Sequence, residues 1–279
     1  MPSLAMLFQS HLDPTIDGDR LLAQILNDFP DVDSSLLKLE RPTAPDAPLS
    51  FSYGDQMIVL MPVAAQVGDD LNEIAAHSRL WPNEVPAPSD YRAHTIVTVL
   101  RPNAAPSHVA SIADAILLSK VIASAVALSD TIVAVYFGSA NHVILPAIFR
   151  DLALETLPNP ILPAWVALNV APRPDGVMTG HTRGLDMLNL MDVEIAESQE
   201  SAEDTFTRIV NTAIYQIENG PIVGDGDTIG ETNAADVVAR HAPSQVDEDK
   251  IVLALEFIGA GNAPVGGQQK KRRWFGRKR

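Results

Sequence analysis

Apolar residues recur at helical spacing most clearly between Ala202 and Asn219. They occupy positions i, i+3, i+4, i+7, i+8 and i+11 and therefore share one face: Phe206, Ile209, Val210, Ala213, Ile214 and Ile217. Ser201 followed by Asp204 is an acidic variant of the capping box, and Gly220-Pro221 ends the pattern. A stripe of leucines and isoleucines from Asp17 to Phe29 predicts a second helix, which Pro30 stops.

Runs rich in alternating or β-branched apolar residues predict the strands. Two of these runs meet at Gly54-Asp55 and two more flank the turn at Pro174-Asp175-Gly176, which indicates two hairpins. The predicted strands are Leu4–Gln9, Leu49–Gly54, Gln56–Pro62, Ala93–Leu100, Thr131–Phe137, Pro163–Ala171, Gly176–Thr182, Leu188–Ser198 and Lys250–Ile258. Further helices are predicted over Asp69–Ser78 and Leu145–Leu157.

The longest apolar stretch runs from Ala115 to Phe137 and contains Lys120 and Asp130. A charge near the centre of a bilayer costs about 2.5–3.5 kcal/mol, so two charges argue against a membrane span. Dividing the stretch at Ser129-Asp130 gives a helix capped by Ser107 and then a strand, both of ordinary length. We therefore expect a buried helix and a buried strand of a soluble core, and no transmembrane segment.

Strands, hairpins and helices follow one another without a sustained βαβ repeat, which favours an α+β fold over a doubly wound parallel sheet. The recurring order strand, helix, hairpin, helix, strand predicts mixed or antiparallel sheets with packed helices, as two ferredoxin-like units side by side. We expect one α+β half over residues 1–160 and a second over residues 161–258. Residues 259–279 are expected to form a flexible linker and a basic tail.

Composition limits the chemistry that the chain can carry. It has no cysteine, which excludes disulfides, thiolate metal sites and a cysteine nucleophile. The N-terminal segment has no basic region before its apolar run and does not resemble a signal peptide. The net charge is −15, yet seven of the 20 basic residues lie within residues 270–279, so the rest of the chain carries 13 basic and 35 acidic residues and a net charge of −22. Such an acidic body repels nucleic acid and anionic lipid, whereas the tail attracts both.

The segment GDGDTIG, Gly224 to Gly230, packs three glycines and two aspartates into seven residues. It departs from a dinucleotide fingerprint because its third glycine is one position late and its aspartates would repel a pyrophosphate. As an EF-hand-like loop it would use Asp225, Asp227 and Asp236, but position 5 is an isoleucine and position 12 is usually a glutamate. The alternative is a tight turn whose aspartates bond nearby backbone N–H groups. We expect no cofactor, with a divalent cation at this loop as the alternative.

The segment TGHTRG, Thr179 to Gly184, places His181 and Arg183 two residues apart on a predicted strand, so their side chains share a face. This pair could bind an anion or supply a general base. No nucleophile or carboxylate stands at a recognised spacing from them, and the alternative is a strand end with exposed polar side chains.

Other catalytic patterns are missing from the sequence, and no catalytic residue is assigned. The remaining histidines stand singly, and no H-E-x-x-H, H-x-H or G-x-S-x-G motif occurs. Ser139 in FGSAN is the nearest approach to a nucleophile turn and lacks the flanking glycines. The acidic runs AESQESAED and VDEDK are expected to be solvated faces, the first favouring a helix N-terminus through its charge.

The tail KKRRWFGRKR combines basic and aromatic residues in the manner of a surface-binding peptide. Each basic residue near an anionic bilayer contributes about 1 kcal/mol, and an aromatic pair adds interfacial anchoring. Nucleic-acid phosphates, the acidic body itself, and a solubility role without a target are the alternatives. The residues expected to bind the surface are Lys270, Lys271, Arg272, Arg273, Trp274, Phe275, Arg277, Lys278 and Arg279.

From about Pro163 to Ile258 the chain resembles a bacterial family of uncharacterised proteins, domain of unknown function 4261. The similarity lies in TGHTRGLDMLNLMDVEIAES, the amphipathic helix after it, the GPIVGDGDTIG turn and the strand IVLALEF. The segment DMLNLMDVEI departs from the family pattern, where a glycine and an aromatic residue are frequent. The resemblance implies a bacterial cytoplasmic protein and makes GDGDTIG a family feature, but it implies no reaction.

These observations predict a non-enzymatic, cytoplasmic protein that binds another macromolecule, of the immunity or adaptor kind. We expect a protein partner, with the tail holding the chain at the inner face of the membrane or on nucleic acid. The alternative is a small-ligand or cation-dependent hydrolase, which requires TGHTRG and GDGDTIG to converge in space.

Overall fold

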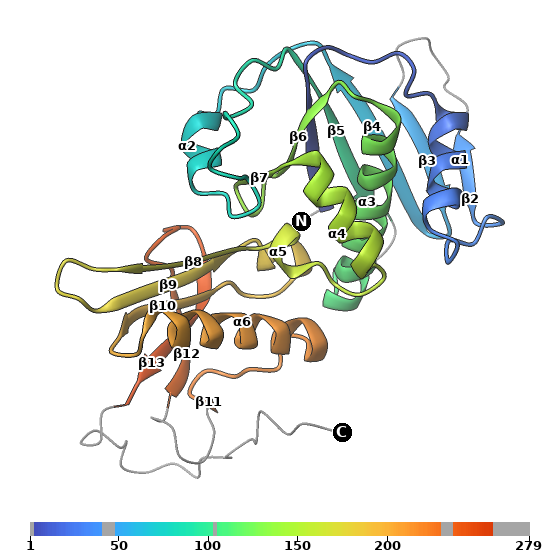
Figure 1. The fold of residues 1–279 in the computed structure, drawn as a ribbon. Helices are drawn as coiled ribbons and strands as arrows, with labels where there is room; N and C mark the ends of the chain where they lie inside the picture. Colours follow the sequence, from blue (N-terminus) through green and yellow to red (C-terminus); the bar gives the residue numbers. More distant parts are fainter. Residues whose placement is uncertain (1–2, 41–47, 103–104, 230–236, 259–279) are drawn as a thin grey trace. The chain divides into compact units, whose positions relative to one another are not determined.

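The computed structural model describes residues 3–40, 48–102, 105–229 and 237–258, whose helices and strands are shown in Figure 1. These residues form two compact units, each built on its own sheet. Unit 1 contains the residues up to Ala167 together with Met187–Asn189, and unit 2 contains Leu168–Asp186 and the residues from Leu190 onward. The predicted α+β class with antiparallel and mixed sheets is confirmed.

Unit 1 is built on a seven-stranded antiparallel sheet with the order β2-β3-β4-β5-β1-β6-β7 among the described residues. Its strands are β1 (Ser3–Gln9), β2 (Leu37–Glu40), β3 (Leu49–Tyr53), β4 (Gln56–Val63), β5 (Ala93–Leu100), β6 (Ile132–Phe137) and β7 (His142–Ile144). Its helices are α1 (Gly18–Asp28), α2 (Leu71–Ala76), α3 (His108–Leu128), α4 (Pro146–Thr156) and α5 (Leu162–Trp165). The elements β1, α1, β4, β5, α3 and β6, with the sheet order β4-β5-β1-β6, make a ferredoxin-like core that β2, β3 and β7 extend.

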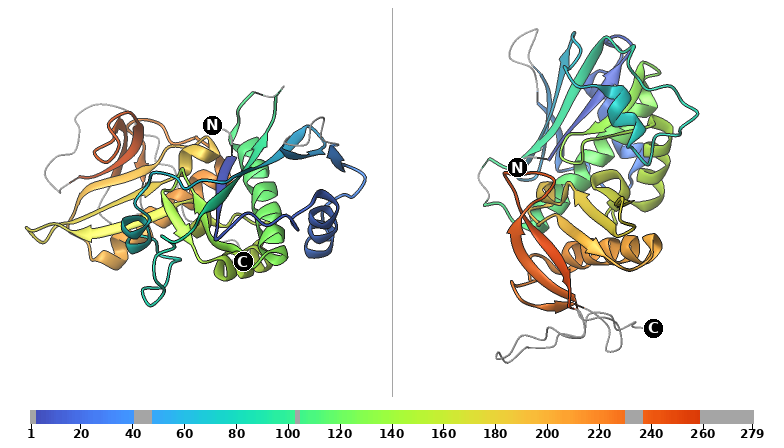
Figure 2. Two further views of the ribbon diagram at one scale, coloured as in Figure 1. Left: turned by 90° about the horizontal axis from the view of Figure 1, so that it is seen from above. Right: turned by 90° about the vertical axis from the view of Figure 1, so that its left-hand side faces the viewer.

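The central strands of the unit 1 sheet carry buried apolar side chains on both faces of the sheet. α1, α3 and α4 pack together over one face, as Figures 1 and 2 show. On the other face, Phe8 stacks on Tyr91 and Tyr136, with ring centroids 4.6 and 5.6 Å away. α2 and Trp81 complete this second core.

α3 is the one helix of the described residues that is long and apolar enough to cross a membrane, and most of it is buried within the fold. Lys120, in the middle of this helix, donates to Asp31 and lies over the Phe29 ring, 5.5 Å from its centroid. A charge that is paired in this way is compatible with a core helix. Ser107 caps the helix as predicted, accepting a hydrogen bond from Ala110 N at 3.2 Å.

Unit 2 is built on a six-stranded mixed sheet with the order β11-β12-β13-β10-β9-β8 among the described residues, and α6 lies along one face of it (Figure 2). Its strands are β8 (Ala167–Pro172), β9 (Met178–Arg183), β10 (Val193–Ser198), β11 (Thr228–Ile229), β12 (Val237–Pro243) and β13 (Ile251–Phe257), and α6 spans Ala202–Asn219. Strands β10 and β13 are adjacent and parallel. This pair differs from the ferredoxin-like order, because that order is antiparallel throughout.

Two predicted strand boundaries are corrected, and one strand was not predicted. The run predicted as a strand from Pro163 begins as the short helix α5, in which Pro163 lies in the first turn, a position that favours proline. Trp165 at the end of this helix is fully buried and donates to Ser119 Oγ at 2.8 Å. The strand predicted from Leu188 begins only at Val193, after the 3-10 turn η1 (Leu185–Leu188). β12 was not predicted, since its sequence VVARHAP carries only a short apolar run.

Candidate functional site

His181 and Arg183 lie on β9 with their side chains directed away from α6. Gly180, the residue before His181, faces α6: a Cβ added to it would lie 2.3 Å from Ile209 Cδ1 on that helix. Because side chains alternate along a strand, His181 and Arg183 share the opposite face of the sheet, as the sequence predicts.

His181 belongs to a row of residues that crosses the sheet of unit 2. The row takes one residue from each of five adjacent strands: Asn169, His181, Glu194, Ala254 and Arg240. Asn169 Nδ2 lies 3.2 Å from His181 Nε2, and Glu194 is the directly paired residue on β10. Burial lowers the pKa of His181, the charge of Glu194 raises it and that of Arg183 lowers it again. The net shift is downward, so the imidazole is neutral at pH 7 and can accept a proton or a hydrogen bond.

Arg183 carries a donor that the described residues leave unsatisfied. Its Nε is buried, and no acceptor in the described part of the chain lies within hydrogen-bonding distance of it. A guanidinium with a free donor beside a neutral imidazole suits an oxyanion such as a carboxylate or phosphate. The anion-binding role predicted for this pair therefore has a chemical basis, and it stays a prediction.

Residues Gly224 to Asp227 of the GDGDTIG segment form a hydrogen-bonded turn just before β11, and Gly230 lies outside the described residues. Asp227 Oδ2 accepts from Gly224 N at 2.8 Å, and Asp225 Oδ1 accepts from His241 N at 3.0 Å. Gly226 has φ 84°, which favours glycine, and its N–H donates to Ala239 O at 2.8 Å. The two carboxylates thus serve as backbone acceptors in this turn, while Asp236 lies outside the described residues.

TGHTRG and GDGDTIG do not converge within unit 2. Asp227 directly precedes β11, and its backbone carbonyl accepts from Ala239 N on β12. Four strand intervals separate β11 from β9. At about 4.8 Å for each interval, His181 and Asp227 lie roughly 19 Å apart. The hydrolase alternative required these two segments to meet, and the structure does not bring them together.

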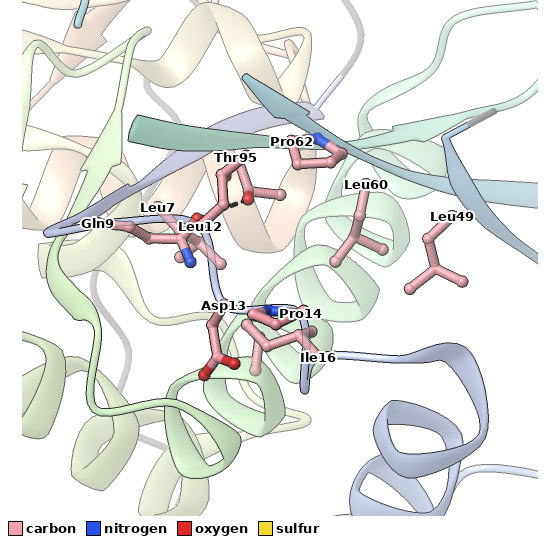
Figure 3. A pocket seen from close by; sticks show the side chains of 11 residues that line it. Leu7, Gln9, Leu12, Asp13, Pro14, Ile16, Leu49, Leu60, Pro62 and Thr95 are labelled. Atoms are coloured by element: carbon pink, nitrogen blue, oxygen red, sulfur yellow. Dashed lines mark hydrogen bonds between the residues drawn. The ribbon is translucent and has the colours of Figure 1, made fainter. Parts of the chain in front are cut away.

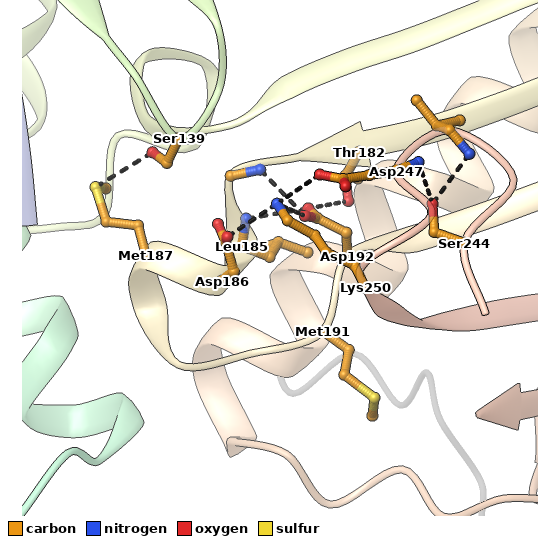
Figure 4. Close-up of polar contacts among 12 residues, drawn as sticks. Ser139, Thr182, Leu185, Asp186, Met187, Met191, Asp192, Ser244, Asp247 and Lys250 are labelled. Carbon is orange, nitrogen blue, oxygen red and sulfur yellow. Dashed lines mark hydrogen bonds and ion pairs between the residues drawn. The ribbon is translucent and has the colours of Figure 1, made fainter. Parts of the chain in front are cut away.

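A second polar cluster lies where β9 ends and β10 begins, and Figure 4 shows its contacts. Asp192 is 5% exposed and accepts hydrogen bonds from Thr182 Oγ1 at 2.8 Å and from Leu185 N at 3.1 Å. Burial raises the pKa of Asp192, although these hydrogen bonds oppose the shift. Lys250 Nζ reaches into the cluster and lies 2.9 Å from Asp186, 3.5 Å from Asp247 and 3.9 Å from Asp192.

The lysine is fixed in its charged form. Burial lowers the pKa of Lys250, but the hydrogen bond and charge of Asp186, with the charges of Asp192 and Asp247, outweigh it and raise the pKa. The cluster ties η1, the start of β10 and the β12–β13 loop to one another. A lysine held charged by three carboxylates is a poor nucleophile, and its ion pairs hold these three segments together.

The β12–β13 loop is also hydrogen-bonded to Glu194, which belongs to the row of residues that contains His181. Glu194 is 7% exposed and accepts from Ser244 Oγ and from Gln245 N, the latter at 2.9 Å. Ser244 Oγ in turn accepts from Asp247 N at 2.8 Å. The loop therefore closes over the carboxylate that pairs with His181.

Neither the ion pairs of Lys250 nor the hydrogen bonds between this loop and Glu194 were predicted from the sequence. VDEDK was expected to be a solvated face, whereas Lys250 in it forms ion pairs with Asp186, Asp192 and Asp247. The signal that could have shown this is the isolated Asp192 between apolar residues in NLMDVEI, because a buried carboxylate needs a partner. AESQESAED does supply the expected helix cap: Ser201 Oγ accepts from Asp204 N at 3.1 Å.

Ser139 is not hydrogen-bonded to a described histidine or carboxylate that could activate it as a nucleophile. Its Oγ donates to Met187 Sδ at 3.6 Å, and no histidine is bonded to it among the described residues. The described residues also contain no group of three or more histidine, aspartate or glutamate side chains able to hold a metal ion.

Unit 2 is a mixed α+β domain with one helix-covered sheet face and a polar row on the other face. Residues 181–256, from within β9 to within β13, match the family described as a domain of unknown function, DUF4261. The resemblance expected from the sequence is confirmed over these residues, which include Arg183, the GDGDTIG turn and the Asp192–Lys250 cluster. Neither the curated proteins nor the solved structures contain a match to the chain.

Proposed function

We propose that this protein is a non-enzymatic, cytoplasmic protein of the immunity or adaptor kind, which binds a protein partner through its body and an anionic surface through its basic tail. The observation that carries the proposal is the separation of charge along the chain. Residues 270–279 hold seven basic residues, while the rest of the chain has a net charge of −22.

The tail has the chemistry of a membrane-surface anchor. Its seven basic residues would contribute about 7 kcal/mol at most on an anionic bilayer, at roughly 1 kcal/mol each. Trp274 and Phe275 add contacts at the level of the lipid headgroups. The acidic body is repelled by the same surface, which would leave it facing the cytoplasm and a partner.

The arrangement of unit 2 supports binding over catalysis. The two segments that carried the enzyme alternative lie roughly 19 Å apart by strand spacing. The carboxylates of Asp225 and Asp227 accept hydrogen bonds from backbone amides, and Lys250 is held by three aspartates.

Vesicle sedimentation tests the proposal. The full chain should sediment with vesicles of phosphatidylserine and phosphatidylcholine at low salt and be released at high salt, because the attraction is screened. Deletion of residues 270–279 should abolish sedimentation. A Trp274→Ser, Phe275→Ser double variant keeps all seven charges and should bind more weakly than the full chain.

Two outcomes would contradict the membrane assignment. One is a full chain that never sediments with anionic vesicles. The other is a full chain that binds a single-stranded or duplex oligonucleotide at the same salt concentration while vesicles leave it in solution, which would make nucleic acid the target.

A further inference from the structure

Unit 1 contains a cavity of about 500 Å³ between its sheet and the segment that leads into α1 (Figure 3). Side chains of β1, β3, β4, β5 and α3 form its walls, together with residues of the β1–α1 segment. Leu49, Leu60 and Ile16 make the apolar surface that Figure 3 shows around it. The volume lies in the range of about 300–1,000 Å³ that is typical of small-molecule sites.

Short side chains border this space. Pro62 pairs with Thr95 across β4 and β5, and Ala125 of α3 lines the same space. Thr95 and Ala125 are buried, whereas Pro62 is exposed. The cavity therefore opens to solvent beside Pro62, where a small molecule can enter it.

The floor of the cavity carries buried polar groups, which an ordinary apolar core lacks. Gln9 is 1% exposed and Thr95 is 8% exposed. Thr95 Oγ1 donates to Gln9 Oε1 at 2.7 Å, and Gln9 Nε2 donates to Thr131 Oγ1 at 3.2 Å. Because the Thr95 hydroxyl donates its proton to Gln9, the lone pairs of its oxygen are left to accept a hydrogen bond from a bound molecule.

A carboxylate stands beside the same space. Asp13 accepts hydrogen bonds from Thr15 N at 2.8 Å and from Ser129 Oγ. The hydrogen bond from Ser129, followed by those from Thr15, lowers the pKa of Asp13, so the group is ionised at pH 7. Its negative charge disfavours an anionic ligand and favours one that donates hydrogen bonds.

We propose that this cavity binds a small amphiphile with an aliphatic body and a head group that donates hydrogen bonds, a hydroxyl or an ammonium. The aliphatic body contacts Leu49, Leu60 and Ile16. The head group lies between Asp13 and the Thr95 hydroxyl oxygen, and both accept hydrogen bonds from it. A carboxylate head group is rejected by Asp13.

Three probes with the same chain and different head groups test the proposal: octylamine, octanol and octanoate. Thermal unfolding of the full chain at pH 7 should shift to higher temperature with octylamine and with octanol, and not with octanoate. Butylamine has the charge of octylamine without the long chain, so it should give no shift. Isothermal titration with octylamine then gives the affinity directly.

Matched variants locate the site. Leu60→Trp places a large side chain in the cavity and should abolish the shifts, whereas Leu154→Trp makes the same replacement at an exposed position of α4 and should retain them. Asp13→Asn keeps the shape of the side chain and should lower the preference for octylamine over octanoate by about tenfold, the effect of one charge-assisted hydrogen bond.

Any of three results would overturn the proposal: no shift with octylamine or octanol, shifts that persist in Leu60→Trp, or octanoate binding as well as octylamine. If Leu60→Trp does not fold, the Asp13→Asn comparison decides, because an unchanged preference between the two probes would equally exclude a head group at Asp13.

Discussion

Most buried charged and polar side chains of the described residues have a hydrogen-bond or ion-pair partner. Lys120 is matched to Asp31, Asp192 to Thr182 and backbone amides, and His142 to a backbone carbonyl. Each of them would destabilise the fold if it were left without its partner, since an unsatisfied buried polar group costs about 1–3 kcal/mol. Arg183 Nε, Gln216 Oε1 and Thr228 Oγ1 are the exceptions among the described residues. Arg183 Nε belongs to a charged group, so an anion is the natural ligand to test there.

We expect the stability of unit 1 to depend on pH through His142. Its Nε2 lies 2.7 Å from Ala164 O, which requires the Nε2–H tautomer of a neutral ring, and burial lowers its pKa from 6.5 to about 4 despite the hydrogen bond. The unfolded chain therefore binds a proton between pH 6.5 and 4 that the folded chain does not. Stability should fall as the pH drops through this window, by up to about 1.4 kcal/mol for each pH unit.

Urea unfolding followed by tryptophan fluorescence at pH 7 and pH 5 measures this effect. His142→Gln removes the titrating ring, so the variant should lose less stability than the wild-type chain between the two pH values. His181→Gln serves as the control for the other histidine whose pKa burial lowers. Equal losses in wild-type and His142→Gln chains would show that the ring is not held neutral.

At the scale of elements, the GDGDTIG turn is expected to depend on its carboxylates as hydrogen-bond acceptors. Asp227→Ala should lower the free energy of unfolding by about 0.5–1.5 kcal/mol because Gly224 N loses its acceptor, while Asp227→Asn should be close to neutral. Thermal unfolding of both variants with and without Ca²⁺, Mg²⁺, Mn²⁺ and Zn²⁺ checks this expectation.

A cation bound at this turn would produce a different pattern. A ligand present at 100 times its dissociation constant adds about 2.7 kcal/mol of stability. Stabilisation of the wild-type chain by one of these metals, lost in both Asp225→Ala and Asp227→Asn, would assign a cation site and reopen the enzyme alternative.

Elements with strong local signals were predictable from the sequence, and those defined by distant partners were not. α6 carries a cap, a full apolar stripe and a glycine stop, and it forms over the predicted residues. β5 and α3 likewise follow β-branched content and a serine cap. In contrast β2 and β7, of four and three residues, become strands through pairing with β3 and β6, which no local pattern specifies.

The candidate sites divide in the same way. The shared face of His181 and Arg183 follows from strand alternation, and the turn chemistry of Asp225 and Asp227 from the glycines around them. The Asp192–Lys250 contact joins residues 58 positions apart in the sequence. The cavity beside Gln9 forms where β1, β3, β4, β5 and α3 meet. Such arrangements are set by tertiary packing, so sequence spacing does not reveal them.

At the scale of the molecule, the chain combines two sheets with separate cores and an acidic body with a basic tail. Unit 1 has its own helix layer and aromatic cluster, and unit 2 has α6 over its mixed sheet. Trp81 and Trp165 are both buried in unit 1, and the third tryptophan of the chain is Trp274. Tryptophan fluorescence in a Trp274→Phe background therefore reports unit 1 alone, while circular dichroism reports both units.

This difference in probes allows a test of whether the two units unfold separately. In Gly180→Ala the new Cβ would lie 2.3 Å from Ile209 Cδ1 and 3.2 Å from Asn169 O, so we expect unit 2 to lose about 1–3 kcal/mol. Gly68→Ala is the matched control, because no atom lies within 4 Å of the added Cβ. We expect Gly180→Ala to lower a transition seen by circular dichroism while the fluorescence transition stays in place, since each unit has a core of its own. Equal shifts of both transitions would instead show that the two sheets unfold as one cooperative structure.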